Sequence, residues 1–439
     1  MALVLGGYLF FGRPFAHVGV PWTPIYVGEA LLAAGVYAML AERRTAVAVV
    51  TGSAPLQAVL ALLVLTVARL PGDFASHRVA ALQDAAVCYY TVFAVVVACV
   101  ACTSDASAQW LAGWYRRAIP WLLAWIPVAV LLSRSSDPGS AEALSGRTVP
   151  GTDVALFGFK AGDLAMHAAV AVAFLWLCDR PASAHDRLCR TALTALGLGG
   201  ILVAGSVNRG GLLTGAVVIC ATVALCRERK QLVGTALGSL TVVLALTAVS
   251  GVSVDVAGRD VSLPQLAENA RSIFDADVDA ADQRGTVEWR LEYWSAVAGD
   301  VWNGRAGPLG YGFGTNLADR YGFQVATDEE DQRLRNAHNS HLSVMARLGL
   351  PGFAVWTLLW FVWLRTLWRA RRSHSSEEVN RRFATWLLIA VAAVLFNAVF
   401  DPILEGPQVA IWTWTLFGVG CAVATGRKAA PPSPVLTAP

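Results

Sequence analysis

Residues 46–68 have the sequence AVAVVTGSAPLQAVLALLVLTVA, and residues 232–252 have the sequence LVGTALGSLTVVLALTAVSGV. Neither stretch contains a charged side chain, and each is long enough to cross the hydrocarbon core of a bilayer as a helix. In lipid, a helix satisfies all the backbone hydrogen bonds of such a segment internally. These stretches therefore predict a membrane protein built from helices.

The rest of the chain repeats this pattern. The 439 residues are 56% hydrophobic and only 15% charged, with a mean hydropathy of +0.52, whereas soluble proteins carry about 25% charged residues. We predict an all-α polytopic integral membrane protein with about 12 transmembrane helices. The predicted spans are 2–11 (a weak one), 25–41, 46–68, 79–102, 118–132, 154–178, 191–207, 210–225, 232–252, 341–364, 383–400 and 409–424.

The loops between these spans alternate in basic charge. One set holds most of the loop cations, and the opposite set holds only Arg13, Arg69, Arg78, Arg134, Arg147 and Arg209. Cytoplasmic loops are the more basic ones, so we expect both termini in the cytoplasm if the weak first span is real. The net charge of +3 gives no indication of nucleic-acid binding.

One long polar loop interrupts the series, and the alternation places it on the extracytoplasmic side. We divide the chain into an N-terminal transmembrane bundle (1–252), this extracytoplasmic loop with short helices (253–337), C-terminal transmembrane helices (338–426) and a Pro-rich, disordered tail (427–439). The eight cysteines lie outside the loop, which argues against a disulfide framework.

The loop contains two ordered motifs. Within 287–302, Arg290, Trp294, Val297 and Val301 recur at helical spacing, which predicts an amphipathic helix on the membrane surface or the mouth of the bundle. The stretch 307–314, GPLGYGFG, follows; four glycines in it predict a tight turn. The next span then opens with NAHNSHL at 336–342.

Three side chains in this region suggest chemistry. Arg209 lies where two spans meet at the outer face, either as a functional cation or as a snorkelling one. Arg290 lies beside Trp289 and Trp294, where it could make a cation–π contact or offer its planar fork to a phosphate. His338 lies at the mouth of a helix with Asn339 as a plausible N-cap, and that electropositive end favours a neutral imidazole able to act as a general base.

Several other polar residues have competing explanations. His341 is a rival to His338 for the role of base. The run Asp275, Asp277, Asp279 and the acidic run 328–331 are interpreted as solvated loop, since an EF-hand needs glycine where Ala280 stands; we predict no metal site. Ionisable residues inside spans are costly and often functional, and we expect Lys160 and Asp163 to neutralise each other. The ionisable residues inside spans are Glu29, Lys160, Asp163, His167 and Asp401.

Four stretches in order resemble the O-antigen ligase and O-antigen polymerase superfamily of bacterial membrane glycan transferases. They are NRGGLL (208–213), WRLEYW (289–294), GYGFGTN (310–316) and AHNSHL (337–342), the last followed by LGLPG (348–352). The resemblance is sharpest from about Arg209 to Phe353 and covers the N-terminal half only in topology. The family pattern commonly has an acidic residue where Arg347 stands, and an aromatic or apolar one where His341 stands; the second difference favours His338 as the family histidine.

The resemblance implies transfer of an oligosaccharide from a polyprenyl diphosphate carrier to the hydroxyl of a glycan or glycolipid acceptor, without metal or cofactor. It also implies that Arg209 and Arg290 bind the diphosphate and that His338 activates the acceptor. Trp294, Asn339, Gly312 and Gly314 lie in the same motifs and would support the site. The sequence leaves open whether the enzyme is a ligase or a polymerase.

Two other classes remain as alternatives. A multi-span transporter or flippase for a lipid-linked glycan is favoured by the ionisable residues inside spans, and is disfavoured because paired halves are not detectable. A structural membrane scaffold would explain the spans, but it would not explain the arginine, glycine and histidine motifs.

Overall fold

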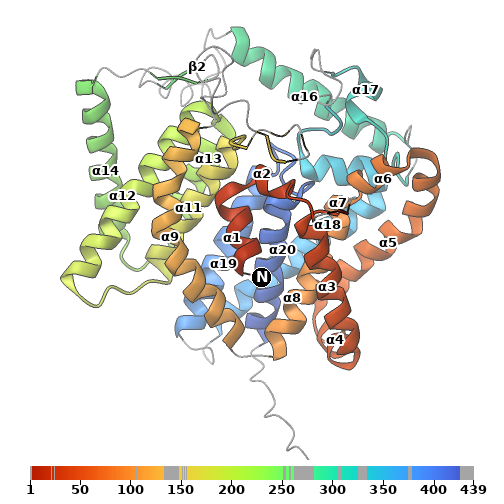
Figure 1. Ribbon diagram of the computed structural model, residues 1–439, viewed down its shortest axis with the longest axis horizontal. Helices are drawn as coiled ribbons and strands as arrows, with labels where there is room; N and C mark the ends of the chain where they lie inside the picture. Colours follow the sequence, from red (N-terminus) through yellow and green to blue (C-terminus); the bar gives the residue numbers. More distant parts are fainter. Residues whose placement is uncertain are drawn as a thin grey trace, which may run out of the picture.

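The computed structural model is a bundle of helices (Figure 1). It describes residues 2–20, 22–23, 25–103, 106–132, 148–150, 152, 154, 156–250, 254–256, 259–261, 281–304, 306, 308–324, 334–373 and 378–425. The Asp275–Asp277–Asp279 run, the acidic run 328–331, Gly307 and the predicted tail lie outside the described residues, so the expectations for them stay predictions.

The chain contains the following helices: α1 (Ala2–Phe11), α2 (Arg13–Ala16), α3 (Val27–Ala41), α4 (Arg43–Thr51), α5 (Ala54–His77), α6 (Val79–Asp84), α7 (Ala86–Tyr89), α8 (Val92–Thr103), α9 (Ala106–Leu132), α11 (Ala161–Leu177), α12 (Ala184–Val207), α13 (Arg209–Leu225), α14 (Arg229–Ser250), α16 (Ala281–Trp302), α17 (Leu317–Tyr321), α18 (Ser340–Arg372), α19 (Glu378–Asn397) and α20 (Pro407–Thr425). One short antiparallel hairpin, β1 (Val254–Val256) with β2 (Arg259–Val261), accompanies them.

Five of these helices, α5, α12, α18, α19 and α20, are long and apolar enough to cross a membrane. Shorter apolar helices, among them α1, α3, α11 and α13, stand beside them. The structure therefore agrees with an all-α membrane protein, and the number of spans stays a prediction.

The predicted span at 46–68 is wrong as a single helix. The chain breaks at Gly52 and Ser53, with α4 ending before them and α5 beginning after them with a proline in its first turn. Proline is tolerated there because its missing N–H would have no partner in the first turn. The predicted span at 79–102 is likewise divided, into α6, α7 and α8. Apolar composition alone does not show such breaks.

Helix α11 forms the centre of the bundle. Every residue from Gly162 to Leu177 is buried, and α11 packs against α12, α13 and α19. The first turn of α11 therefore meets the first turn of α13 and the last turn of α19 at one end of the molecule.

The loop helix α16 lies across the top of the bundle in Figure 1, near α17, and packs on α18. A helix is present where the spacing predicted one, and it begins earlier than expected, at Ala281. Its inner face buries Tyr293, Val297 and Val301 completely or nearly so.

Candidate active site

His338 lies in a short, strained segment directly before α18. Its φ of +50° is in the left-handed region, which is unusual for a residue other than glycine, and its backbone N–H donates to Asn336 Oδ1 at 3.1 Å. Asn339 then caps α18, because its Oδ1 accepts from the N–H groups of His341 and Leu342 at 3.0 and 3.1 Å. The predicted N-cap is confirmed, and the backbone around His338 is held in one conformation.

Helix α16 fixes this segment from the other side. Trp294 Nε1 donates to the carbonyl of Ala337 at 2.8 Å, and the Tyr293 hydroxyl donates to the carbonyl of Asn336 at 3.2 Å. The Trp289 ring meets His338 edge to face, with the centroids 6.3 Å apart. The WRLEYW motif therefore positions the histidine, which gives Trp294 a definite supporting contact.

Arg290 lies on the same helix and is half-buried. Burial lowers its pKa, and the carboxylate of Asp401 opposes this. Its Nε is buried and has no hydrogen-bond partner in the part of the chain that the structure describes. A buried guanidinium N–H without a partner is costly, and it would gain from an anion.

A salt bridge that the sequence did not predict lies beside this region. We use the word corner for the end of the bundle where the first turns of α11 and α13 meet the turn after α19. Lys160 Nζ lies 2.9 Å from Asp401 Oδ1, joining the start of α11 to the turn after α19. Asp163, which we expected to neutralise Lys160, acts on its charge but forms no salt bridge with it among the described residues; Asp163 Oδ1 lies 3.5 Å from the Asn397 amide. The pairing follows from packing, since residues 241 positions apart in sequence meet here.

Arg209 enters the same corner from α13. Asn208 caps this helix by accepting from the N–H of Gly211 at 2.8 Å. A Cβ on Gly211 would lie 2.8 Å from Gly162 Cα, and one on Gly210 would lie 3.1 Å from Phe400 Cβ. The two glycines therefore let the first turn of α13 pack tightly against the first turn of α11 and the residue before Asp401.

The electrostatics of this corner act on His338. Burial lowers its pKa to about 4; the Asp401 carboxylate raises the pKa, and the charges of Arg290 and Lys160 lower it. The imidazole is therefore neutral near pH 7. The site thus combines a neutral histidine with cations whose carboxylate counter-charge comes from Asp401.

His341 has a different role from His338. Its Nδ1 accepts from Trp356 Nε1 at 2.9 Å, and its Nε2 lies 3.0 Å from the carbonyl of Leu395. Since the carbonyl can only accept, Nε2 carries the proton. The Nδ1 contact lies within α18 and the Nε2 contact joins α18 to α19. Both ring nitrogens are thus in use, which leaves His338 as the candidate base.

The predicted glycine-rich turn is confirmed at residues 310–314. We call the contacts that it makes with α5 and α6 the clasp. Gly310, Gly312 and Gly314 have φ values of +72°, +81° and +98°. A Cβ at Gly312 would collide with the Asp73 carboxylate, and one at Gly314 would collide with His77. The turn is thus pressed against the end of α5, and glycine is required for its backbone conformation and for this close approach.

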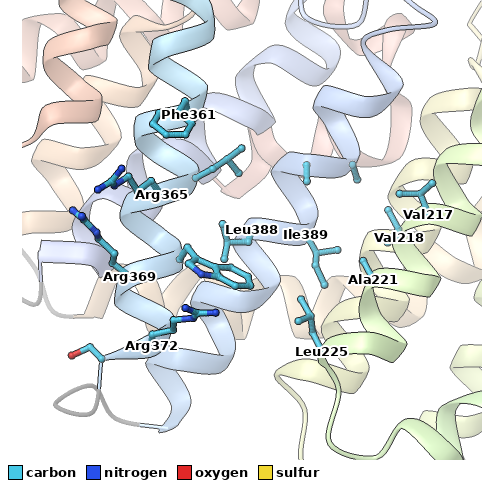
Figure 2. Close-up of a pocket in the computed structure, with 15 residues that line it drawn as sticks. Val217, Val218, Ala221, Leu225, Phe361, Arg365, Arg369, Arg372, Leu388 and Ile389 are labelled. Carbon is cyan, nitrogen blue, oxygen red and sulfur yellow. The ribbon is translucent and has the colours of Figure 1, made fainter.

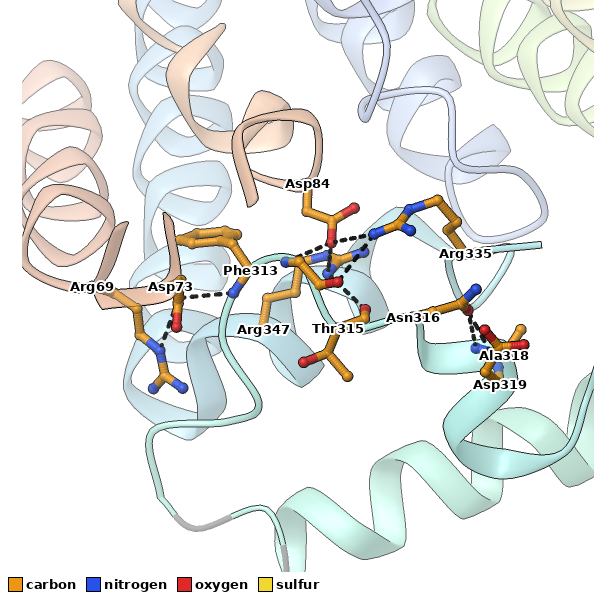
Figure 3. Close-up of polar contacts among 11 residues, drawn as sticks. Arg69, Asp73, Asp84, Phe313, Thr315, Asn316, Ala318, Asp319, Arg335 and Arg347 are labelled. Carbon is orange, nitrogen blue, oxygen red and sulfur yellow. Dashed lines mark hydrogen bonds and ion pairs between the residues drawn. The ribbon is translucent and has the colours of Figure 1, made fainter. Parts of the chain in front are cut away.

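Two carboxylates of the N-terminal half hold this turn (Figure 3). Asp73 Oδ2 accepts from the N–H of Phe313 at 2.8 Å, and Asp84 Oδ2 accepts from the N–H of Gly314 at 2.7 Å. Arg69 donates to the carbonyls of Leu309 and Gly310 at 2.6 and 3.0 Å.

Arg347, which departs from the family pattern, is completely buried in this clasp. Its Nη1 lies 2.6 Å from Asp84 Oδ2, and Arg335 Nη2 lies 3.4 Å from the same atom. The carboxylate that balances Arg347 thus comes from α6. Gly312 and Gly314 support the site through this clasp and do not contact His338 in the described structure.

Lys160 and Asp401 are the site residues that motif reasoning missed. Sequence analysis noted both as ionisable residues inside spans, but it assigned neither to the motif cluster. Their signal was intramembrane charge; their partners depend on the packing of α11 and α19.

One family model matches part of the chain. Residues 193–357 match the model of a family described as O-Antigen ligase. This range contains Arg209, Arg290 and His338 and ends before Asp401. No curated protein matches the chain.

Proposed function

We propose, from the match of residues 193–357 to the O-antigen ligase family, that the chain transfers an oligosaccharide from a polyprenyl diphosphate carrier to an acceptor sugar hydroxyl. The observation that carries the proposal is the pairing of a neutral histidine with partly buried cations at one end of a membrane bundle. Asp401 pairs with Lys160, whereas Arg290 Nε has no hydrogen-bond partner among the described residues.

The positive charge of this region suits a diphosphate. Arg290 and Lys160 act on His338 together with the Asp401 carboxylate, and Arg209 is the first residue of α13. Cations in a low-dielectric site stabilise charge that develops on a leaving diphosphate more strongly than they would in water. The planar guanidinium of Arg290 would donate two parallel hydrogen bonds to the diphosphate. The Lys160–Asp401 pair would orient the surrounding charges.

His338 would take the proton from the acceptor hydroxyl. Burial lowers its pKa, and the charges of Arg290 and Lys160 also lower it; a bound diphosphate would offset these charges. The imidazole would therefore become a stronger base when the donor is bound, which couples donor binding to acceptor activation.

A polar pocket on the loop region offers a place for the acceptor chain. It has a volume of about 560 Å³ and is lined by Ser295, Ala296, Gly299, Asp300, Asn303, Arg320 and Tyr321. Asp300 lies eleven residues beyond Trp289 on α16, which is about 16 Å along a helix. Hydroxyl, amide and charged groups of this kind hydrogen-bond sugar hydroxyls. We place the glycan chain between this pocket and His338.

The charge distribution supports an extracytoplasmic site. Basic side chains from three loops predicted to be cytoplasmic, Arg180, Arg227, Arg381 and Arg382, gather around Glu378. Glu378 begins α19, whereas the candidate site lies beyond the end of α19. The basic cluster and the site therefore lie at opposite ends of one apolar helix, as the positive-inside rule requires for this orientation.

A flippase for a lipid-linked glycan is the rival function, and its main support was intramembrane charge. In the structure, Lys160 and Asp401 belong to the same corner as His338, so the transferase explains them as well. The transferase is therefore the better-supported proposal.

The test is glycan transfer in proteoliposomes from a polyprenyl diphosphate-linked oligosaccharide, with EDTA present throughout. We expect His338→Ala to lose transfer and His341→Gln to retain most of it, with both variants folded by circular dichroism. Full activity of His338→Ala would refute the assignment of the base. No transfer by the wild type, combined with movement of the donor between leaflets, would favour the flippase.

A further inference from the structure

An apolar groove lies on the bundle away from the candidate site (Figure 2). It has a volume of about 870 Å³ and runs between α13, α18 and α19. Val217, Ala221 and Leu225 form one wall along α13, and Leu388 and Ile389 lie between this wall and α18. A groove of this composition on a membrane-embedded surface is suited to hydrocarbon chains.

Cations line the α18 side of the groove. Arg365, Arg369 and Arg372 of α18 all line the groove and follow one another at intervals of four and three residues; in Figure 2 the Arg372 side chain extends towards the groove. All three are exposed. Among the described residues none of them forms a salt bridge, whereas the neighbouring Arg381 and Arg382 are paired with Glu378.

The position of these arginines matches the depth of a membrane surface. Arg372 is 23 residues beyond the break in α18 at Gly349, which is about 35 Å of helix and comparable to the hydrocarbon thickness of about 30 Å. Trp368 lies among them, with the guanidinium of Arg372 4.9 Å from its ring centroid. Tryptophan and arginine together are typical of the level of lipid headgroups.

We propose that this groove binds an anionic phospholipid, with an acyl chain against α13 and α19 and the headgroup phosphate on Arg365, Arg369 and Arg372. The apolar walls select a lipid over a free phosphate. The guanidinium groups, which have no carboxylate partner among the described residues, select an anionic headgroup over a zwitterionic one. This site is separate from the donor site, which lies at the first turn of α13, and it does not rest on the proposed function.

The test uses the full-length protein, delipidated in detergent and titrated by native mass spectrometry with phosphatidylglycerol, phosphatidylcholine or glycerol phosphate. Each basic residue near a membrane surface strengthens anionic-lipid binding about fivefold, so the triple variant R365Q/R369Q/R372Q should bind phosphatidylglycerol roughly a hundredfold more weakly. The matched control R43Q/R44Q/R117Q removes three exposed arginines of other helices and should bind like the wild type.

A second variant tests the apolar part of the site. Ala221→Phe fills the groove and should weaken phosphatidylglycerol binding while leaving all the arginines in place. Equal binding of phosphatidylglycerol and phosphatidylcholine by the wild type would overturn the proposal. So would glycerol phosphate binding as tightly as the lipid, or equal losses in the triple variant and its control.

Discussion

The Arg290→Lys variant should lose most of its transfer activity although it keeps its charge. Arg290 presents a buried Nε with no partner among the described residues, on a helix that is fixed to the His338 segment through Trp294 and Tyr293. Its guanidinium is thus placed to donate two parallel hydrogen bonds to a phosphate, whereas an ammonium group lacks this fork.

The expected size of the effect follows from the loss of one charge-assisted hydrogen bond. Such a bond contributes about 1.5–3 kcal/mol, and each 1.36 kcal/mol corresponds to a factor of ten in rate. We therefore expect kcat/KM to fall by roughly 10- to 150-fold. If the lost contact strengthens in the transition state, kcat falls along with kcat/KM.

The pH dependence of kcat/KM distinguishes the two hydrogen bonds that the Arg290 guanidinium donates from the positive charge that it carries. The pKa of His338 is lowered to about 4, so the base stays neutral, and active, until the pH falls towards that value. Arg290 is one of the charges that lower this pKa, so Arg290→Met should move the acid limb of kcat/KM to higher pH. Arg290→Lys retains the charge and should leave the acid limb in place.

The assay is initial-rate transfer in proteoliposomes over a range of pH, with Arg117→Lys as the control. Arg117 is exposed and lies on α9, so its variant should match the wild type. The reasoning is refuted if Arg290→Lys stays within about twofold of the wild type in kcat/KM, since the charge alone would then be sufficient.

Three further predictions concern the supports of the site. Asp401→Asn removes the carboxylate that raises the pKa of His338, so the acid limb of kcat/KM should move to lower pH; an unchanged limb would place Asp401 outside the site. Asp84→Ala leaves the buried charge of Arg347 without its carboxylate and should cost about 3–5 kcal/mol of unfolding free energy, seen as a lower Tm. Gly314→Ala, at φ +98° and against His77, should also lower Tm, whereas Gly72→Ala, in an open helical position, should not; equal effects would argue against the clasp.

The sequence by itself determined the class of the protein and the local structure of its motifs. Long apolar segments predict helices because lipid provides no hydrogen bonds for the backbone, and α12, α13, α19 and α20 lie where the apolar runs indicated. The amphipathic spacing around Arg290 predicted α16, the glycines predicted the turn at 310–314, and Asn339 predicted the start of α18. These features depend on residues close together in the chain.

The tertiary structure decided which charges meet. Lys160 forms its salt bridge with Asp401 and Arg347 pairs with Asp84. His341 bonds to Trp356 and to the carbonyl of Leu395 on α19, which leaves His338 as the candidate base. Breaks such as the one between α4 and α5 also became visible only in the structure. Local periodicity describes a helix and its faces, but the partner of a buried charge is set by the packing of helices that lie far apart in the sequence.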